Sequence, residues 1–67
     1  MSKGYLRSGT AVNGGTFAVI YINSIDTIEG MDEVEGCNVN EIVAGSMAYD
    51  QAQNVAVYDG EHWHYEE

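Results

Sequence analysis

The fold class is decided by one segment, Gly45-Ser-Met-Ala-Tyr-Asp-Gln-Ala-Gln-Asn-Val-Ala-Val-Tyr-Asp-Gly-Glu-His-Trp-His-Tyr65. Large hydrophobic side chains alternate with other residues in three short runs, and this period of two is typical of β-strands. Polar residues 50–54 and the pair Asp59-Gly60 separate the runs as turns would. We therefore predict an all-β protein, built as a small antiparallel β-meander or a partly open sandwich or barrel.

The length of the second turn determines which side chains share a face. Asp59-Gly60 is typical of a two-residue turn, but that turn would place Val55 and Val57 opposite Trp63. A connection of three residues instead gathers four large side chains on one face, namely Val55, Val57, Trp63 and Tyr65. We therefore predict a three-residue connection, with Gly60 at a positive φ that a Cβ would disfavour.

The chain of 67 residues is one domain near the lower size limit for independent folding. Cys37 is the only cysteine, so no intrachain disulfide forms, and no Cys/His quartet offers a zinc site. A core this small gives little stability by itself, so another source of stability is needed. Oligomerisation is the best explanation, and we expect the chain to bind copies of itself.

The composition is strongly acidic, with a formal net charge of −9 and only Lys3 and Arg7 as strong bases. Binding to a phosphate backbone is excluded, because no basic patch can form. Such a charge suits a basic partner surface or the mimicry of nucleic acid. No apolar run approaches the roughly 20 residues of a membrane span, and the beginning lacks a signal peptide's hydrophobic core. We expect synthesis and use in a cytoplasm, without a membrane partner.

The first fifteen residues are rich in Gly, Ser, Thr and Asn, a composition that favours a mobile arm over a packed element. We predict an arm over residues 1–15 and a single small β domain over residues 16–67. Both strong bases lie in the arm, and every acid lies beyond it. The arm is either a disordered start or a segment that docks on the acidic body of a neighbouring subunit.

Residues 16–22 form a continuous apolar run, Thr16-Phe-Ala-Val-Ile-Tyr-Ile22, whose length and β-branched content predict a strand. Phe17 and Val19 face one way, and Ile20 and Ile22 face the other. Both faces are apolar and need cover. Either the meander covers one face and another subunit covers Ile20 and Ile22, or the strand is central and buried; both interpretations remain open.

Residues 23–36 carry five carboxylates and are predicted to be mostly a solvated acidic loop. One helical turn with Ile25 and Ile28 is expected at its start, limited by Gly30. The carboxylates lack the spacing of a calcium loop. Residues 37–43 return to a strand-like pattern.

No residue pattern indicates catalysis, since there is no G-x-S-x-G elbow, no identifiable partner for Cys37 and no phosphate-binding loop. His62 and His64 share one face of a strand about 7 Å apart. A solvent-facing polar stripe is favoured there over a metal on an oligomer axis. Trp63 with Tyr58 would make a sugar-stacking platform, but a core position is favoured. We expect no catalytic, cofactor-binding or metal-binding residue and no cofactor.

Part of the sequence resembles a pattern that recurs in tailed-phage virion proteins, roughly G-[SD]-x-A-Y-x-D followed by Y-V-Y-D-G-x-x-W. The matching residues are Gly45-Ser46, Ala48-Tyr49-Asp50, Val55–Tyr58, Asp59-Gly60 and Trp63, preceded by Tyr21–Ile28. The resemblance covers roughly residues 19 to 65. Val55 stands where the pattern has Tyr, and the Pro residues common after the earlier segment are missing.

The resemblance implies a small virion structural protein of the head-fibre, capsid-decoration or tail-fibre type, with no active site. Such a protein would be made in the host cytoplasm and bind the particle exterior as an oligomer, with a trimer favoured and a major capsid or other virion protein as partner. The candidate interface and structural residues are Phe17, Val19, Ile20, Ile22, Val55, Val57, Gly60, Trp63 and Tyr65. The alternative is a small acidic phage-encoded inhibitor that mimics nucleic acid, and a third possibility is a carbohydrate-binding module.

Overall fold

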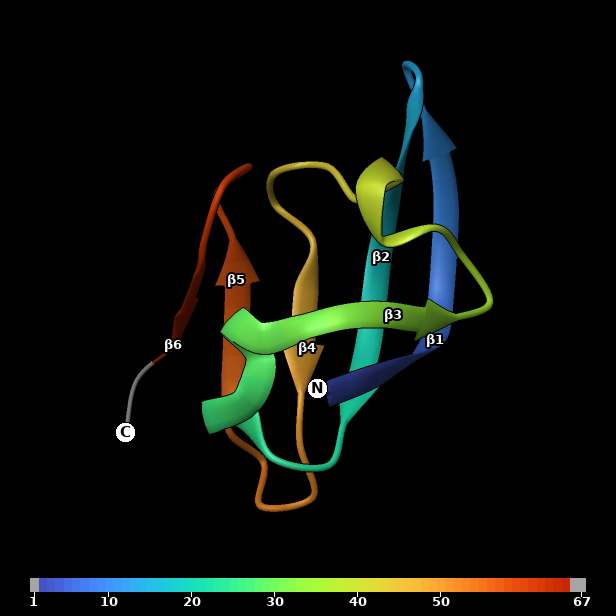
Figure 1. The fold of residues 1–67 in the computed structure, drawn as a ribbon. Coiled ribbons are helices and arrows are strands. Elements are labelled where there is room, and N and C mark those ends of the chain that lie inside the picture. Colours follow the sequence, from blue (N-terminus) through green and yellow to red (C-terminus); the bar gives the residue numbers. More distant parts are fainter. Residues whose placement is uncertain (1, 66–67) are drawn as a thin grey trace.

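The computed structural model describes residues 2–65, which form six strands and two short 3-10 helices (Figure 1). The elements are β1 (Ser2–Val12), β2 (Gly15–Ile22), η1 (Ile25–Gly30), β3 (Met31–Glu35), η2 (Val39–Glu41), β4 (Met47–Tyr49), β5 (Val55–Tyr58) and β6 (Trp63–Tyr65). Met1, Glu66 and Glu67, at the ends of the predicted arm and domain, lie outside the described residues.

All six strands belong to one curled sheet in the order β3-β1-β2-β4-β5-β6. The all-β fold class is therefore confirmed, and β4, β5 and β6 form the predicted antiparallel meander. The sheet as a whole is mixed, because β1 pairs in parallel with β3 and β2 pairs in parallel with β4. These two parallel pairings join segments far apart in the chain, so local sequence patterns did not reveal them.

The prediction of a mobile arm is wrong. β1 pairs with β2 from Gly4 opposite Ile22 to Val12 opposite Gly15, with an irregularity between Leu6 and Ser8. Its beginning also pairs with β3. The Gly- and Ser-rich composition favours loops, but pairing with an apolar neighbour overrides this preference, because strand propensity depends strongly on context. The β domain therefore includes the segment that was predicted to be an arm.

The core lies on one side of the sheet, where β3 crosses in front of β4 and β2 and η1 lies in front of β5 (Figure 1). Ile20 and Ile22 are almost fully buried there, together with Ile28 of η1. The proposal that this side of β2 meets another subunit is therefore wrong. The predicted helical turn with Ile25 and Ile28 is confirmed as η1, and it supplies part of the cover.

The acidic segment is more ordered than the sequence predicts. Met31 and Val34 of β3 point into the core, whereas the three acids of this strand are exposed. The prediction of a solvated loop was wrong here because two apolar residues among carboxylates are a weak signal of a strand. The strand predicted over residues 37–43 is also wrong, since η2 lies there and Asn38 caps it by accepting a hydrogen bond from the Asn40 N–H at 2.9 Å.

The predicted three-residue connection between β5 and β6 is wrong. Val57 lies opposite His64 and Tyr58 lies opposite Trp63, so four residues separate the strand ends. An even number of linking residues places Val55 and Val57 on the face away from Trp63. Ala48 and Ala56, which are fully buried, take the inward positions instead. The positive φ predicted for Gly60 is confirmed, at 105°.

Candidate functional site

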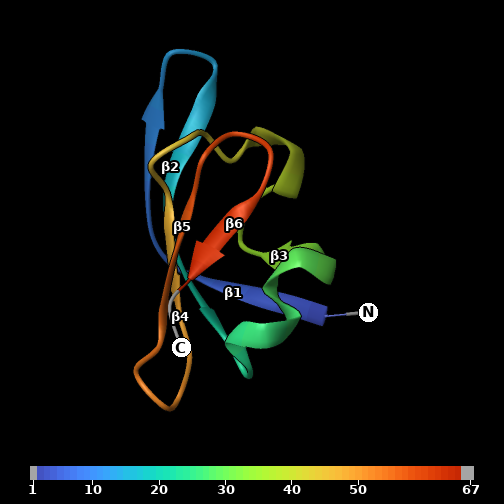
Figure 2. The ribbon, with the colours of Figure 1, turned by 90° about the vertical axis from the view of Figure 1, so that its left-hand side faces the viewer.

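One face of the sheet has no cover among residues 2–65. Figure 2 shows η1, η2, β3 and the beginning of β1 on one side of β2, β4 and β5, while the other side is bare. We call this bare side the outer face. Its large side chains are Tyr5, Phe17, Val19, Tyr21, Met47, Tyr49, Val55 and Val57.

Strand pairing arranges these side chains in rows across the sheet. Tyr5 lies opposite Tyr21, Tyr21 opposite Tyr49, and Tyr49 opposite Val55. The rings of Tyr21 and Tyr49 meet edge to face, with centroids 5.5 Å apart. The adjacent row contains Val19, Met47 and Val57. Because directly opposed side chains are neighbours on one face, the two rows form a continuous surface.

The outer face is substantially exposed. Phe17 is 39%, Met47 40%, Val55 46% and Val57 44% accessible, and Tyr5 is 36% accessible. With side chains of roughly 150–250 Å² each, these fractions give an exposed apolar area on the order of 400 Å². Apolar patches of this size on a small protein are often interaction surfaces.

Charge is concentrated on the opposite side of the molecule. η1 and β3 carry five exposed carboxylates, which together we call the acidic layer: Asp26, Glu29, Asp32, Glu33 and Glu35. None of the eight side chains that define the outer face is a carboxylate. Lys3, at the edge between the two sides, lies 3.4 Å from Glu33, which raises the pKa of the lysine ammonium. The two sides therefore offer different chemistry to a partner.

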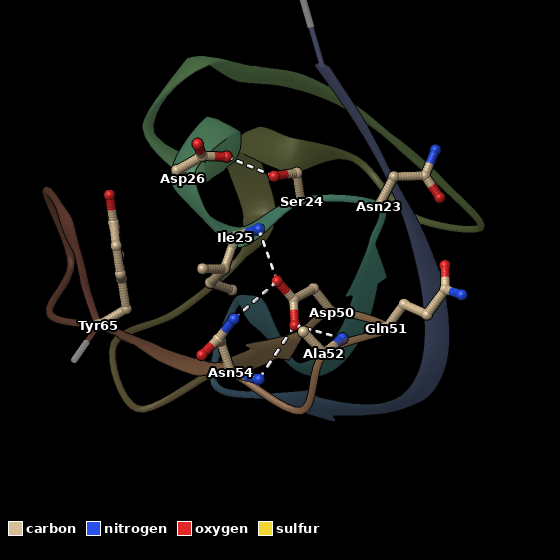
Figure 3. A pocket seen from close by; sticks show the side chains of 9 residues that line it. All are labelled: Asn23, Ser24, Ile25, Asp26, Asp50, Gln51, Ala52, Asn54 and Tyr65. Carbon is tan, nitrogen blue, oxygen red and sulfur yellow. Dashed lines mark hydrogen bonds between the residues drawn. The ribbon is translucent and has the colours of Figure 1, made fainter. Parts of the chain in front are cut away.

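Asp50 is the most densely hydrogen-bonded side chain described. Its Oδ1 accepts the N–H groups of Ala52 and Asn54, each at 3.0 Å. Its Oδ2 accepts the Ile25 N–H at 3.0 Å and the Asn54 side-chain amide at 3.1 Å (Figure 3). Burial alone would raise the pKa of this carboxyl, but the hydrogen bonds outweigh burial and lower it. Asp50 thus ties the beginning of η1 to the β4–β5 connection.

The hollow around Asp50 does not contain a catalytic arrangement. Its polar lining includes the amides of Asn23, Gln51 and Asn54, with Tyr65 at one side (Figure 3). The four hydrogen bonds to Asp50 occupy its oxygens. Ser24 donates its hydroxyl hydrogen to Asp26 in an exposed contact, and the lining residues include neither histidine nor cysteine. The hollow is therefore explained by its structural role.

The two histidines contact different carboxylates. The Nε2 of His64 lies 2.6 Å from Oδ2 of Asp59, and the Nδ1 of His62 lies 3.6 Å from Oε1 of Glu29. Asp59 also accepts the N–H groups of His62 and Glu61, and these bonds together with His64 hold its pKa far below the ordinary value. Both imidazoles are exposed, and residues 2–65 contain no group of three or more His, Cys, Asp and Glu side chains placed to hold a metal.

Trp63 and Cys37, the two other candidate groups, are buried and half-buried, respectively. Trp63 is only 8% exposed, and its ring lies 4.9 Å from that of Tyr58. The favoured core position of Trp63 is confirmed, and the sugar-stacking platform is wrong because the ring is not accessible. Cys37 is half-buried, and burial followed by the nearby Glu41 raises the pKa of its thiol, which makes it a poor nucleophile.

The structure divides the predicted interface residues into two groups. Phe17, Val19, Val55 and Val57 lie on the outer face, whereas Ile20, Ile22 and Trp63 lie in the core. Tyr65 is half-buried on the inner side, and Gly60 lies in the β5–β6 connection. The tyrosine row and Met47 were missing from the predicted set. The tyrosines and Met47 come together through the pairing of β2 with β4, which could not be predicted from the sequence.

Comparison with protein-family models, with curated proteins and with solved structures gave no significant match. In the described part of the chain, no helix has the length and apolar character needed to cross a bilayer.

Proposed function

We propose that this chain is a structural protein of a tailed-phage particle that acts by adhesion and catalyses no reaction. The observation that carries this proposal is the outer face, an exposed apolar surface on the order of 400 Å². The segment that resembles virion proteins contributes Met47, Val55 and Val57 to this face. The resemblance and the adhesive surface therefore involve the same strands.

The proposed place of the chain is the particle exterior, as a capsid-decoration or head-fibre-type protein present in several copies. A small all-β domain with its own core suits this role. Its partners would be copies of itself and a major capsid or other virion protein. The acidic layer would remain exposed to solvent and keep particles apart through like charge.

Quantitative mass spectrometry of purified particles tests this proposal. The expected result is a fixed ratio of this chain to the major capsid protein that survives density-gradient purification. An abundant non-structural phage protein serves as the control for carry-over from the lysate. The proposal fails if the chain is depleted during purification to the same extent as that control.

A second candidate function is supported by the acidic layer. Five exposed carboxylates lie on η1 and β3, and Lys3 pairs with only one of them. An acidic surface of this kind fits a protein that blocks a basic, DNA-binding host protein by mimicking nucleic acid.

Competition for such a host protein tests the second candidate. The chain should displace duplex DNA from it in fluorescence anisotropy, with an effect that weakens steeply as salt rises. A double variant, Glu33→Gln with Glu35→Gln, should displace DNA less well, whereas Val57→Glu should not. Displacement that is insensitive to both salt and the double variant would exclude mimicry.

A further inference from the structure

We infer that the outer face binds a second copy of this chain, so that two sheets pack face to face in a symmetric dimer. This inference rests on the proposed function in one respect, that the outer face is the working surface, and it names the partner that covers it. The contact would be isologous, with the same side chains contributed by both copies. It replaces the predicted contact through Ile20 and Ile22, which are buried within one copy.

The distribution of charge favours a second copy as the occupant. A basic partner would be attracted to the acidic layer, because the middle of the outer face is apolar and charged side chains lie only at its margins, with Glu35 opposite Tyr5 and the His64–Asp59 pair opposite Val57. An apolar surface is the appropriate complement to the middle of the outer face, around Met47, Val55 and Val57, and a second copy offers such a surface. Burying a partner's charge against it would be costly without a group of opposite charge.

Face-to-face packing also resolves the repulsion between two chains that each carry a formal charge of −9. The acidic layers lie behind the two sheets and would point away from each other (Figure 2). Packed sheets are about 10 Å apart, and one further layer on each side separates the acidic layers by on the order of 30 Å. This is several times the screening length of about 8 Å at physiological ionic strength.

The side chains of the outer face suit the packing of one sheet on another. Met47 of β4 lies between Val19 of β2 and Val57 of β5, which puts it near the middle of the face. The tyrosine row lies beside this centre, and tyrosine rings bury large apolar area while their hydroxyls can remain in water at a margin. A two-fold axis near Met47 would bring the row of Val19, Met47 and Val57 in one copy against the same row in the other, with the tyrosines around them.

The exposed area sets the expected strength of association. About 400 Å² from each copy gives on the order of 800 Å² in total, which is below the roughly 1,200 Å² of stable specific interfaces and in the range of weak, transient contacts. We therefore expect a reversible dimer with a dissociation constant in the micromolar range rather than a permanent assembly. A dimer is inferred in place of the trimer that the resemblance favours, because the outer face is one continuous patch and two such patches cover each other.

Analytical ultracentrifugation of the full chain from about 1 to about 300 µM tests the inference across the range in which a micromolar dimer forms. The wild-type chain should shift from the monomer mass toward twice that mass. Val57→Glu and Met47→Glu should raise the dissociation constant about tenfold or more, because each places two carboxylates in an apolar contact. Ala52→Glu adds the same charge to the exposed β4–β5 connection and should change the constant less than about twofold.

Circular dichroism and thermal unfolding at low concentration show whether each variant is folded as a monomer. A wild-type chain that stays monomeric at the highest concentration would overturn the inference, even if capsid protein binds the outer face. So would a folded Val57→Glu that dimerises as tightly as the wild type, or an Ala52→Glu that is weakened equally. A monomer found in purified particles refutes the dimer alone, whereas a dimer absent from particles refutes the proposed function alone.

Discussion

At the scale of single residues, glycine at position 4 permits β1 to cross the core. A Cβ built on Gly4 would lie 2.6 Å from Cγ2 of Ile20 and 2.6 Å from Sδ of Met31. We expect Gly4→Ala to destabilise the fold by on the order of 1–3 kcal/mol, because the surrounding core must shift. Gly30→Ala is the matched control, since a Cβ there meets no atom within 4 Å. Urea unfolding measures both, and equal midpoints would contradict the packing described for Gly4.

Asp50 gives a residue-scale prediction about pH. Its folded-state pKa lies below the ordinary value of 3.8, so the carboxylate stabilises the fold above that value. This contribution is lost as the pH falls through the folded-state pKa. Asp50→Asn should lower the melting temperature by several degrees near neutral pH, because an amide group would face N–H donors in place of an oxygen.

Thermal unfolding between about pH 6 and about pH 2.5 checks the sign of this effect. The gap in melting temperature between the wild type and Asp50→Asn should narrow toward the acid end, because protonation of this carboxyl in the unfolded chain lowers the stability of the wild type as the pH falls below 3.8. Asp26→Asn, on exposed η1, is the control and should show a smaller gap throughout. A gap that stays constant across the range would mean that Asp50 acts through shape rather than charge.

At the scale of elements, β2 was predictable from its continuous apolar run, and the three strands of the meander were predictable from their alternation. The order of strands was not, because it depends on pairing between distant segments. Buried Ser46 illustrates this: its Oγ accepts the Ala18 N–H at 3.1 Å, which fixes the start of β4 beside β2. From the sequence alone, a serine before a short strand does not indicate which strand it contacts.

The side of each strand that faces the core also depended on one local contact. Asp59 accepts the N–H groups of Glu61 and His62 at 2.8 and 2.7 Å, and this stabilises a four-residue connection. Because the connection has an even number of residues, Val55 and Val57 lie on the outer face. Of the nine predicted interface or structural residues, four lie on the outer face, whereas Ile20, Ile22 and Trp63 belong to the core.

A pair of substitutions tests this division between core and outer face. Ile20→Glu should prevent folding, because it places a carboxylate at a position with no solvent access. Val57→Glu should leave the monomer folded, with a melting temperature within a few degrees of the wild type, because Val57 is 44% exposed. Circular dichroism distinguishes the two outcomes. A folded Ile20→Glu protein together with an unfolded Val57→Glu protein would reverse the assignment of faces.

At the scale of the whole molecule, a short chain has enough material to cover one side of its sheet. η1 and β3 cover the inner side and also carry the acidic layer, so solubility and core formation are served by the same segment. The opposite side is left apolar and exposed, which would be an aggregation hazard without a partner. The acidic composition disfavours contact with a phosphate backbone, and the three-dimensional arrangement shows which apolar surface is exposed.

The central claim is that the chain is held on a phage particle through an assembly that its outer face creates. The most direct measurement is the copy number per particle, by quantitative mass spectrometry, for phage carrying the wild type, Val57→Glu or Ala52→Glu. Two linked copies hold a particle more tightly than one, because the second contact forms at high effective concentration. The account predicts that Val57→Glu falls about tenfold or more in copy number while Ala52→Glu matches the wild type. Particles that retain Val57→Glu at the wild-type copy number, or that contain none of the wild-type chain, would contradict it.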